Sequence, residues 1–195
     1  MKHSSFLARA MEGRGCGEPA NGATLDLTEG GRVWDRGHVE EMKKGRVKVL
    51  FVCIGNACRS PMAEAIARRD HEDVMEVCSA GLAPLGRVEE MTKRTLADNG
   101  YPSEGLESKK IFLQTFEEAD LVVNMSGREK GIAFDDPSKV EDWQVEDPYG
   151  EDAEVYQRIF KDIEKRVGKL AEQLRRARSG GTPARKIRGK ETRER

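Results

Sequence analysis

Cysteine, histidine and aromatic residues are all scarce in this chain, and each shortage narrows the class of protein. The 195 residues include four cysteines and three histidines, and aromatic residues make up 6% of the sequence. Four cysteines are too few for a disulfide scaffold of this length, so reduced thiols in a cytoplasmic protein are expected. No repeat of 20–50 residues is present, which excludes solenoids and favours a single ordinary domain.

Long apolar runs are missing as well. No stretch approaches the roughly 20 apolar residues that a membrane-spanning helix needs. The first ten residues lack the apolar segment of a signal peptide. A membrane span and export are therefore not expected.

An excess of positive charge is also absent, because the formal net charge is −1. The charge is unevenly distributed: nine Lys or Arg and only two acidic residues lie between Leu174 and Arg195. Residues 47–173 are consequently strongly acidic. Nucleic acid is bound by clustered cations that face its phosphates, so it is not expected as a partner.

Three regions of the chain differ in their patterning. Residues 1–46 are glycine-rich and weakly patterned, and are predicted to be an extension with little structure. Met42 is a candidate natural start, which would place residues 1–41 outside the native chain. Residues 175–195 are predicted to be a basic, disordered tail. Residues 47–174 carry clear periodic patterns and are predicted to form the folded domain.

Nearly continuous apolar segments alternate with helical patterns in this domain. The predicted strands are 47–53, 74–79, 120–125 and 141–145. The predicted helices are 62–69 with Ser60 as N-cap, 89–98, a short helix from a capping box at 115–118, and an amphipathic helix over 155–174. The alternation predicts a single three-layer α/β/α domain around a four-stranded parallel sheet, of the flavodoxin or Rossmann-like type. Such folds bind ligands at the carboxyl ends of their strands, so the loop after the first strand is the candidate site.

That loop, Cys53-Ile-Gly-Asn-Ala-Cys-Arg-Ser-Pro61, has the features of an anion site. It joins a buried strand to a helix N-terminus, where backbone N–H groups and the helix dipole attract an anion. Gly55 and Asn56 tolerate left-handed backbone, and the guanidinium of Arg59 can bind two phosphate oxygens. Such a field lowers the pKa of a thiol from about 8.5 toward 3.5–7.5. Cys53 is therefore predicted to attack a bound phosphoryl group and form a cysteinyl-phosphate.

Two simpler interpretations explain less of this pattern. A buried core cysteine at the end of a strand would not require the Gly-Asn and Ser-Pro pairs that follow. A zinc site would need further ligands, but no second Cys or His pair matches the spacing of Cys53 and Cys58, and Cys78 stands alone. We therefore predict no metal at this loop.

The segment C-I-G-N-A-C-R-S-P-M-A-E resembles the phosphate loop of the low-molecular-weight protein tyrosine phosphatases. Three later landmarks agree with the resemblance: Ser79-Ala-Gly81, Ala119-Asp-Leu121 and Glu146-Asp-Pro-Tyr-Gly150. The resemblance implies that residues 47–174 are the catalytic domain of a hydrolase that needs no metal and no cofactor. The implied reaction is hydrolysis of protein phosphotyrosine through a cysteinyl-phosphate.

The resemblance also implies a role for each residue of the site. Cys53 would be the nucleophile, Arg59 the phosphate clamp and Asp147 the general acid. One carboxyl can protonate a phenolate leaving group and then activate water, and a bound dianion raises the pKa of a nearby carboxyl. The implied substrate-binding residues are Ile54, Gly55, Asn56, Ala57, Cys58, Ser60 and Tyr149.

Four of these residues carry a more specific expectation. Ser60 would stabilise the thiolate, Asn56 would hold the loop by a bond to Ser79, and Tyr149 would form an aromatic wall of the pocket. Cys58 has two interpretations: a reversible disulfide with the nucleophile that protects it from overoxidation, or a passive packing residue.

Departures from the family's pattern leave the substrate open. The tryptophan that many members carry after Ser-Ala-Gly is absent from residues 81–86, and Gly150 replaces a second aromatic residue. Ala57 matches neither the threonine usual in protein arginine phosphatases nor the bulkier aliphatic residue of many tyrosine phosphatases, so a protein arginine phosphatase is the main alternative. A thioredoxin-coupled arsenate reductase needs a cysteine pair well downstream, yet the last cysteine is Cys78. A non-catalytic phosphate-binding module is disfavoured by the intact catalytic residues.

The expected partner is a phosphorylated protein substrate, with a tyrosine kinase as one candidate. We expect a monomer or a weak dimer. The basic tail is expected to be solvated, with tethering to acidic partners or membranes as the alternative.

Overall fold

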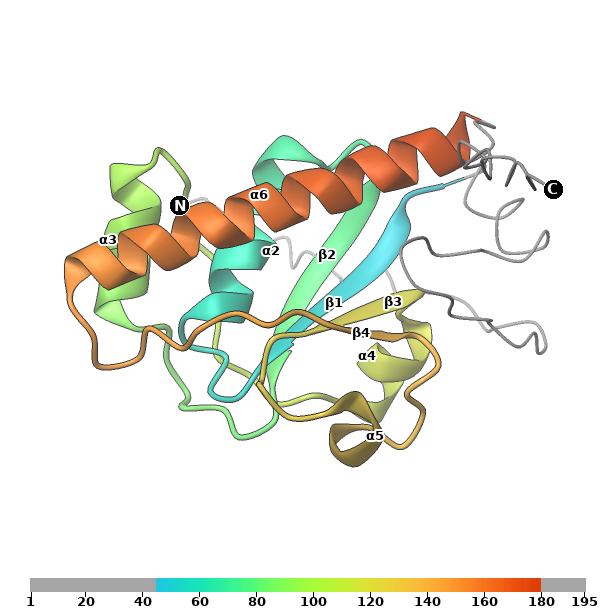
Figure 1. Cartoon of the computed structure of the whole chain (residues 1–195), viewed down its shortest axis with the longest axis horizontal. Coiled ribbons are helices and arrows are strands. Elements are labelled where there is room, and N and C mark those ends of the chain that lie inside the picture. Colours follow the sequence, from blue (N-terminus) through green and yellow to red (C-terminus); the bar gives the residue numbers. More distant parts are fainter. Residues whose placement is uncertain (1–44, 180–195) are drawn as a thin grey trace, which may run out of the picture.

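A four-stranded parallel sheet with helices on both faces forms the centre of the molecule, in a computed structural model that describes residues 45–179 (Figure 1). The strands are β1 (Val47–Cys53), β2 (Met75–Gly81), β3 (Leu121–Asn124) and β4 (Val140–Asp142). Their order is β2-β1-β3-β4, and each pairing is parallel. The predicted three-layer fold with four parallel strands is confirmed.

The helices divide unequally between the two faces of the sheet. They are α2 (Arg59–Asp70), α3 (Glu90–Asp98), α4 (Leu113–Glu118), α5 (Lys130–Ala133) and α6 (Ala153–Arg178). In Figure 1 the long α6 crosses one face together with α2 and α3, whereas α4 and α5 lie on the other side. No helix within residues 45–179 has both the length and the apolar character that a bilayer crossing needs.

The two faces of β1 enter different hydrophobic cores. Val49 and Phe51 pack on the side of α2 and α6, and Leu50 and Val52 pack on the side of α4 and α5. All four side chains are buried. Successive side chains of a strand point to opposite faces, so a strand covered on both sides needs an unbroken apolar run.

The C-terminal helix α6 is longer than predicted. Asp152 caps it by accepting hydrogen bonds from two backbone N–H groups of its first turn. The helix ends at Arg178, so the tail predicted to start at residue 175 is partly helical. Arg175 forms an ion pair with Asp73 at 2.6 Å, and Arg178 donates to the carbonyl of Asp73 at 2.9 Å. Cations in a last turn also interact favourably with the helix dipole, which accounts for the extension.

Two predicted helix starts are wrong for identifiable reasons. Helix α2 begins at Arg59 with Cys58 as its N-cap, because the Ser60 hydroxyl is directed to Cys53 instead of a backbone N–H. Helix α4 begins at Leu113, so Thr115 lies within it and does not cap it. The short α5 was not predicted, and it has no buried residue that would produce a periodic signal.

The strand boundaries differ by smaller amounts. β2 starts at Met75 and continues to Gly81, and β4 ends at Asp142 instead of 145. The predicted N-terminal extension lies outside the described residues except for 45 and 46, and the tail lies outside them beyond residue 179.

Candidate active site

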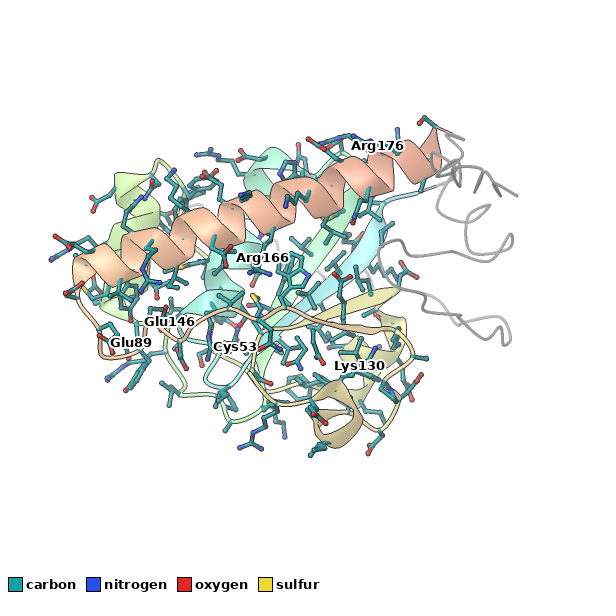
Figure 2. All side chains as sticks on the ribbon, viewed as in Figure 1. Cys53, Glu89, Lys130, Glu146, Arg166 and Arg176 are labelled. Carbon is teal, nitrogen blue, oxygen red and sulfur yellow. The ribbon has the colours of Figure 1, made fainter. Side chains whose placement is uncertain are left out.

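The loop from Cys53 to Arg59 connects the carboxyl end of β1 to the N-terminus of α2. Figure 2 places Cys53 at this end of the sheet, where both Cys53 and Arg59 are buried. Asn56 has a φ of 45°, and it is the one non-glycine residue with positive φ in the described part of the chain. An asparagine adopts this conformation at lower cost than most residues, so the loop can curl around an anion.

Gly55 in the loop and Gly81 at the end of β2 are required because a side chain there would collide with neighbouring atoms, and neither has a positive φ. A Cβ on Gly55 would lie 3.1 Å from Cγ of Leu85, so the missing side chain leaves room for that leucine. A Cβ on Gly81 would lie 2.7 Å from the carbonyl oxygen of Ile54 and 2.9 Å from the backbone nitrogen of Asn56. Only a glycine at the end of β2 lets the loop approach this closely.

Backbone hydrogen bonds attach the loop to its neighbours. The N–H groups of residues 82, 83 and 85 donate to the carbonyl oxygens of the first three loop residues at 2.9–3.1 Å. On the other side, Ala57 accepts from the N–H of Glu89 at 3.1 Å and from the hydroxyl of Thr92 at 2.9 Å. The conformation of the loop is thus set by segments that are distant in the sequence.

Side chains form a second set of bonds on the inner side of the loop. The amide nitrogen of Asn56 donates to the hydroxyls of Ser60 and Ser79, both at 2.9 Å. The amide oxygen of Asn56 accepts from the backbone N–H of Lys109 at 2.8 Å. Ser60 Oγ lies 3.1 Å from Cys53 Sγ. The expected bond between Asn56 and Ser79 is confirmed, and Ser60 lies where it can bond the sulfur.

Arg59 presents a buried guanidinium to the mouth of this loop. It donates to the carbonyl of Val145 at 3.3 Å and forms an ion pair with the carboxylate of Asp147. Its Nε is the only buried side-chain nitrogen or oxygen in residues 45–179 that has no hydrogen-bond partner. Because buried polar groups are nearly always paired, this unpartnered N–H is a donor that is available to bind an anion.

Asp147 and Tyr149 lie on the connection between β4 and α6. The side chain of Asp147 is 44% exposed, and its carboxylate accepts from the backbone N–H of Tyr149 at 3.3 Å. Tyr149 itself is 54% exposed. The neighbouring Glu146, labelled in Figure 2, pairs with Arg158 of α6 at 2.6 Å and helps to hold the connection. The fold therefore brings Asp147 to Arg59 and leaves Tyr149 at the edge of the site.

The other two described cysteines are in different surroundings. Burial raises the pKa of the Cys58 thiol, although a hydrogen bond with Tyr156, 3.3 Å away, opposes this effect. Burial raises the pKa of Cys78, on β2, to about 11. Both side chains are thiols at neutral pH, and neither forms a disulfide. The suggested disulfide between Cys58 and the nucleophile stays a prediction.

The structure adds residues that were not singled out from the sequence. Glu64 on α2 is buried and accepts from the hydroxyl of Ser79, and Leu85 contacts the loop at Gly55. The only sequence signal for Glu64 is its place in the Ala-Glu that ends the loop motif. Within residues 45–179, no group of three or more His, Cys, Asp or Glu side chains is arranged to hold a metal ion.

A parallel α/β fold that places a cysteine, an arginine and an aspartate around one anion loop defines a cysteine-dependent phosphatase type of site. Comparison with known families agrees: the family described as "Low molecular weight phosphotyrosine protein phosphatase" matches residues 48–180. This match covers more than half of the chain, which therefore belongs to that family of phosphatase hydrolases.

Relatives within the family have different activities in their names. Arsenate reductase 1 of Bacillus cereus is 32% identical over 126 residues, which cover 64% of this chain and 93% of the relative. The protein-arginine-phosphatase of Bacillus subtilis is 32% identical over 154 residues, covering 67% and 98%. A solved low-molecular-weight protein tyrosine phosphatase from T. tengcongensis has a TM-score of 0.61 and 28% identity, covering 65% and 99%. Family membership supports phosphatase chemistry, and the substrate is a separate question.

Proposed function

We propose that this chain is a protein tyrosine phosphatase that acts through a cysteinyl-phosphate on Cys53. The observation that carries the proposal is the buried guanidinium of Arg59. Its Nε lacks a partner, and another of its nitrogens contacts Asp147. The guanidinium lies in the same loop as a cysteine whose sulfur is 3.1 Å from a serine hydroxyl. Anion binding, nucleophile and acid thus meet at one loop.

Substrate binding exchanges one anion for another at Arg59. The phosphate of the substrate bonds to the loop N–H groups and to the guanidinium, where it competes with the carboxylate of Asp147. Once displaced, this carboxyl lies beside the oxygen of the leaving group. A phosphate dianion nearby favours the protonated form of a carboxyl, which is the form that a general acid needs.

The reaction then proceeds in two displacements. The Cys53 thiolate attacks phosphorus, the P–S bond forms and the P–O bond to tyrosine breaks, while Asp147 gives its proton to the phenolate oxygen. In the second displacement the Asp147 carboxylate takes a proton from water, and the hydroxide attacks phosphorus. The P–S bond breaks, phosphate leaves and the thiolate is regenerated.

Two exposed side chains support an aromatic substrate. Tyr149 is 54% exposed beside Asp147, and Leu85 is 50% exposed against Gly55. We propose that they contact the two sides of a phosphotyrosine ring, because apolar surface beside a polar loop favours a ring that carries a phosphate. Leu85 would supply the apolar wall that the absent tryptophan provides in other members.

Phosphoarginine is the second candidate substrate. The similarity to a protein-arginine-phosphatase, which is 32% identical and covers 67% of this chain, supports it. The same groups could cleave a P–N bond, with Asp147 protonating the guanidine nitrogen. Arsenate reduction is less supported, because Cys78 is the last cysteine of the sequence and burial raises its pKa to about 11.

The cellular setting follows from the same chemistry. A phosphorylated protein, with a tyrosine kinase as one candidate, is the proposed partner of a monomer or weak dimer. We place the enzyme in the cytoplasm because a cysteine nucleophile and the free thiols around it stay reduced there.

The experiment that tests the proposal compares kcat/KM for peptides of one sequence that carry phosphotyrosine, phosphoserine or phosphoarginine. We expect the phosphotyrosine peptide to have the highest value, with a Cys53→Ser variant as the inactive control. A higher kcat/KM for the phosphoarginine peptide would replace the proposal by its second candidate. Thioredoxin-dependent reduction of arsenate, measured in parallel, would overturn both if it were the only activity.

A further inference from the structure

Glu64 is a buried carboxylate behind the loop that the reaction scheme does not use. It lies on α2, is 1% exposed, and its hydrogen bond and ion pair are to residues other than Cys53. One carboxylate oxygen pairs with Arg68, one turn further along the helix, and the other accepts from the hydroxyl of Ser79 at 2.5 Å. Burying a charge is costly even when it is paired, so the position of this carboxylate calls for an explanation.

The bonds from Glu64 to Cys53 have a single direction. A carboxylate only accepts, so the Ser79 hydroxyl donates its proton to Glu64. The oxygen of the same Ser79 hydroxyl accepts from the amide of Asn56. The second hydrogen of that amide goes to Ser60 Oγ at 2.9 Å. Because the Ser60 oxygen accepts there, its own proton is available for Cys53 Sγ, 3.1 Å away.

The Ser60 proton has one other acceptor within reach. The carbonyl of Ala80 lies 3.4 Å from Ser60 Oγ. A thiolate is the stronger acceptor because it is charged, and the sulfur is closer than the carbonyl oxygen. The Ser60 proton therefore stabilises the charged form of Cys53.

The opposite direction is available to the side chain of Asn56, because a half-turn exchanges its oxygen and nitrogen. The amide oxygen would then accept from both Ser79 and Ser60, and no serine proton would be left for the nucleophile. Two neighbours oppose this arrangement. The N–H of Lys109 would meet an NH2 group, and Glu64 would lose the proton of Ser79.

We propose that Glu64 is a positioning residue that orients this hydrogen-bond chain, so that Ser60 donates to Cys53 and the thiolate fraction of Cys53 increases. Glu64 acts through Ser79, Asn56 and Ser60 and does not touch the substrate. The inference rests on the proposed role of Cys53 as the nucleophile.

The charged and titratable groups around the hydrogen-bond chain from Glu64 to Cys53 come from several elements. Arg68 on α2 supplies the opposite charge that Glu64 needs. Cys78 on β2 lies within electrostatic reach of Glu64 and of Lys109. On the other side of the loop, the neighbouring titratable groups are Cys58 and Asp147.

The test is the pH dependence of Cys53 alkylation by iodoacetamide in the Glu64→Gln variant, followed by mass spectrometry. Arg68 can only donate, so the remaining oxygen of the substituted side chain faces Arg68 and its NH2 group faces Ser79. Ser79 then loses the acceptor for its proton, and the N–H of Lys109 is left as the single neighbour that opposes the reversed arrangement of the Asn56 amide. We expect the midpoint of the pH–rate curve to rise by about one pH unit, which is about a tenfold lower thiolate fraction below the midpoint. In the pH profile of kcat/KM for p-nitrophenyl phosphate, the limb on the acidic side should shift to higher pH by a similar amount. Inhibition by inorganic phosphate should not change, because Arg59 is untouched.

Two further variants make the test specific. Glu90→Gln makes the same change on the surface of α3, where the side chain is 80% exposed and pairs with Lys93, and should leave the midpoint where it is. Ser79→Ala removes the next member of the hydrogen-bond chain. It should raise the midpoint of the alkylation curve, which keeps the test possible even if the Glu64 variant does not fold. The double variant should show no larger shift than Ser79→Ala alone, because both changes act through one chain.

A native-like Glu64→Gln protein with an unchanged midpoint would overturn the inference, and so would additive shifts in the double variant. Alkylation needs no substrate, so this outcome is separate from the proposed function. If the Glu64→Gln variant shows the shift but the wild type does not hydrolyse phosphotyrosine, the proposed substrate is refuted and the role of Glu64 stays intact.

Discussion

The inner side of the phosphate loop and its rim are built differently. The inner side, defined here as Asn56, Ser60, Glu64 and Ser79, is at most 1% exposed, and every member bonds to another. The rim, defined as Leu85, Asp147 and Tyr149, is about half exposed. A change on the inner side breaks several buried bonds at once, whereas a change on the rim alters a surface that faces the substrate. One fold can therefore keep its chemistry and change its substrate.

The two regions meet at Arg59. Its guanidinium is buried with the inner side, yet it contacts the carboxylate of Asp147 on the rim. In the proposed reaction, a phosphate that binds Arg59 displaces the carboxylate of the proposed acid, so its binding acts on the rim directly.

Replacing the proposed nucleophile should have the largest effect. Cys53→Ser is expected to lower kcat for p-nitrophenyl phosphate by about 10⁴-fold or more, because a hydroxyl at this position is not ionised and the covalent route is lost. Circular dichroism should show an unchanged fold. A chelator such as EDTA should leave the wild-type activity intact, since the proposed route needs no metal. Substantial turnover by the serine variant would remove the cysteinyl-phosphate from the scheme.

Asp147→Asn tests whether a residue on the rim takes part in the chemistry. Hydrolysis of phenyl phosphate should slow by about 10²- to 10⁴-fold, and that of p-nitrophenyl phosphate much less, because p-nitrophenolate needs little protonation to leave. Inorganic phosphate should inhibit the variant more strongly than the wild type, because the carboxylate no longer competes for Arg59. Equal losses with both substrates would show that Asp147 is not the acid.

Gly81→Ala tests how closely the inner side is packed. The added Cβ would lie 2.7 Å from the carbonyl oxygen of Ile54, so the loop must shift. We expect the free energy of unfolding to fall by about 1–3 kcal/mol, as measured by denaturant titration. Gly168→Ala is the matched control in α6, where nothing lies within 4 Å, and should stabilise the protein by up to about 1 kcal/mol. Similar effects at both glycines would argue against a close approach at Gly81.

Tyr149→Ala should have the smallest effect and should act on binding alone. Loss of an aromatic contact is expected to raise KM for a phosphotyrosine peptide by up to about tenfold, with kcat nearly unchanged. The melting temperature should not move, because the side chain is 54% exposed. Tyr149→Phe keeps the ring and should behave like the wild type. A fall in stability without a change in KM would place Tyr149 in the fold instead of the substrate pocket.

Much of the fold could be predicted because its signals are local. The apolar run of β1 reports burial on both faces, and the eight buried positions of α6 fall on one face of the helix, at steps of three or four residues with two adjacent pairs. Helices α4 and α5 have no buried residues, so no periodicity marks their ends, and one start was misplaced while the other helix was missed. The N-cap of α2 was misassigned because the Ser60 hydroxyl bonds to a sulfur seven residues away.

One stretch of chain holds the strand, the loop residues and the following helix of the site, so these parts could be predicted from the residues alone. Their order along the backbone is enough to place a thiol and a guanidinium at a helix N-terminus. The groups that reach this stretch from distant parts of the chain are known from the fold and not from the local pattern. Asp147 reaches Arg59 across 88 residues, and Ser79 lies between Asn56 and Glu64 because β2 pairs with β1. The direction of a hydrogen-bond chain depends on all of its members at once, and no local pattern records that direction.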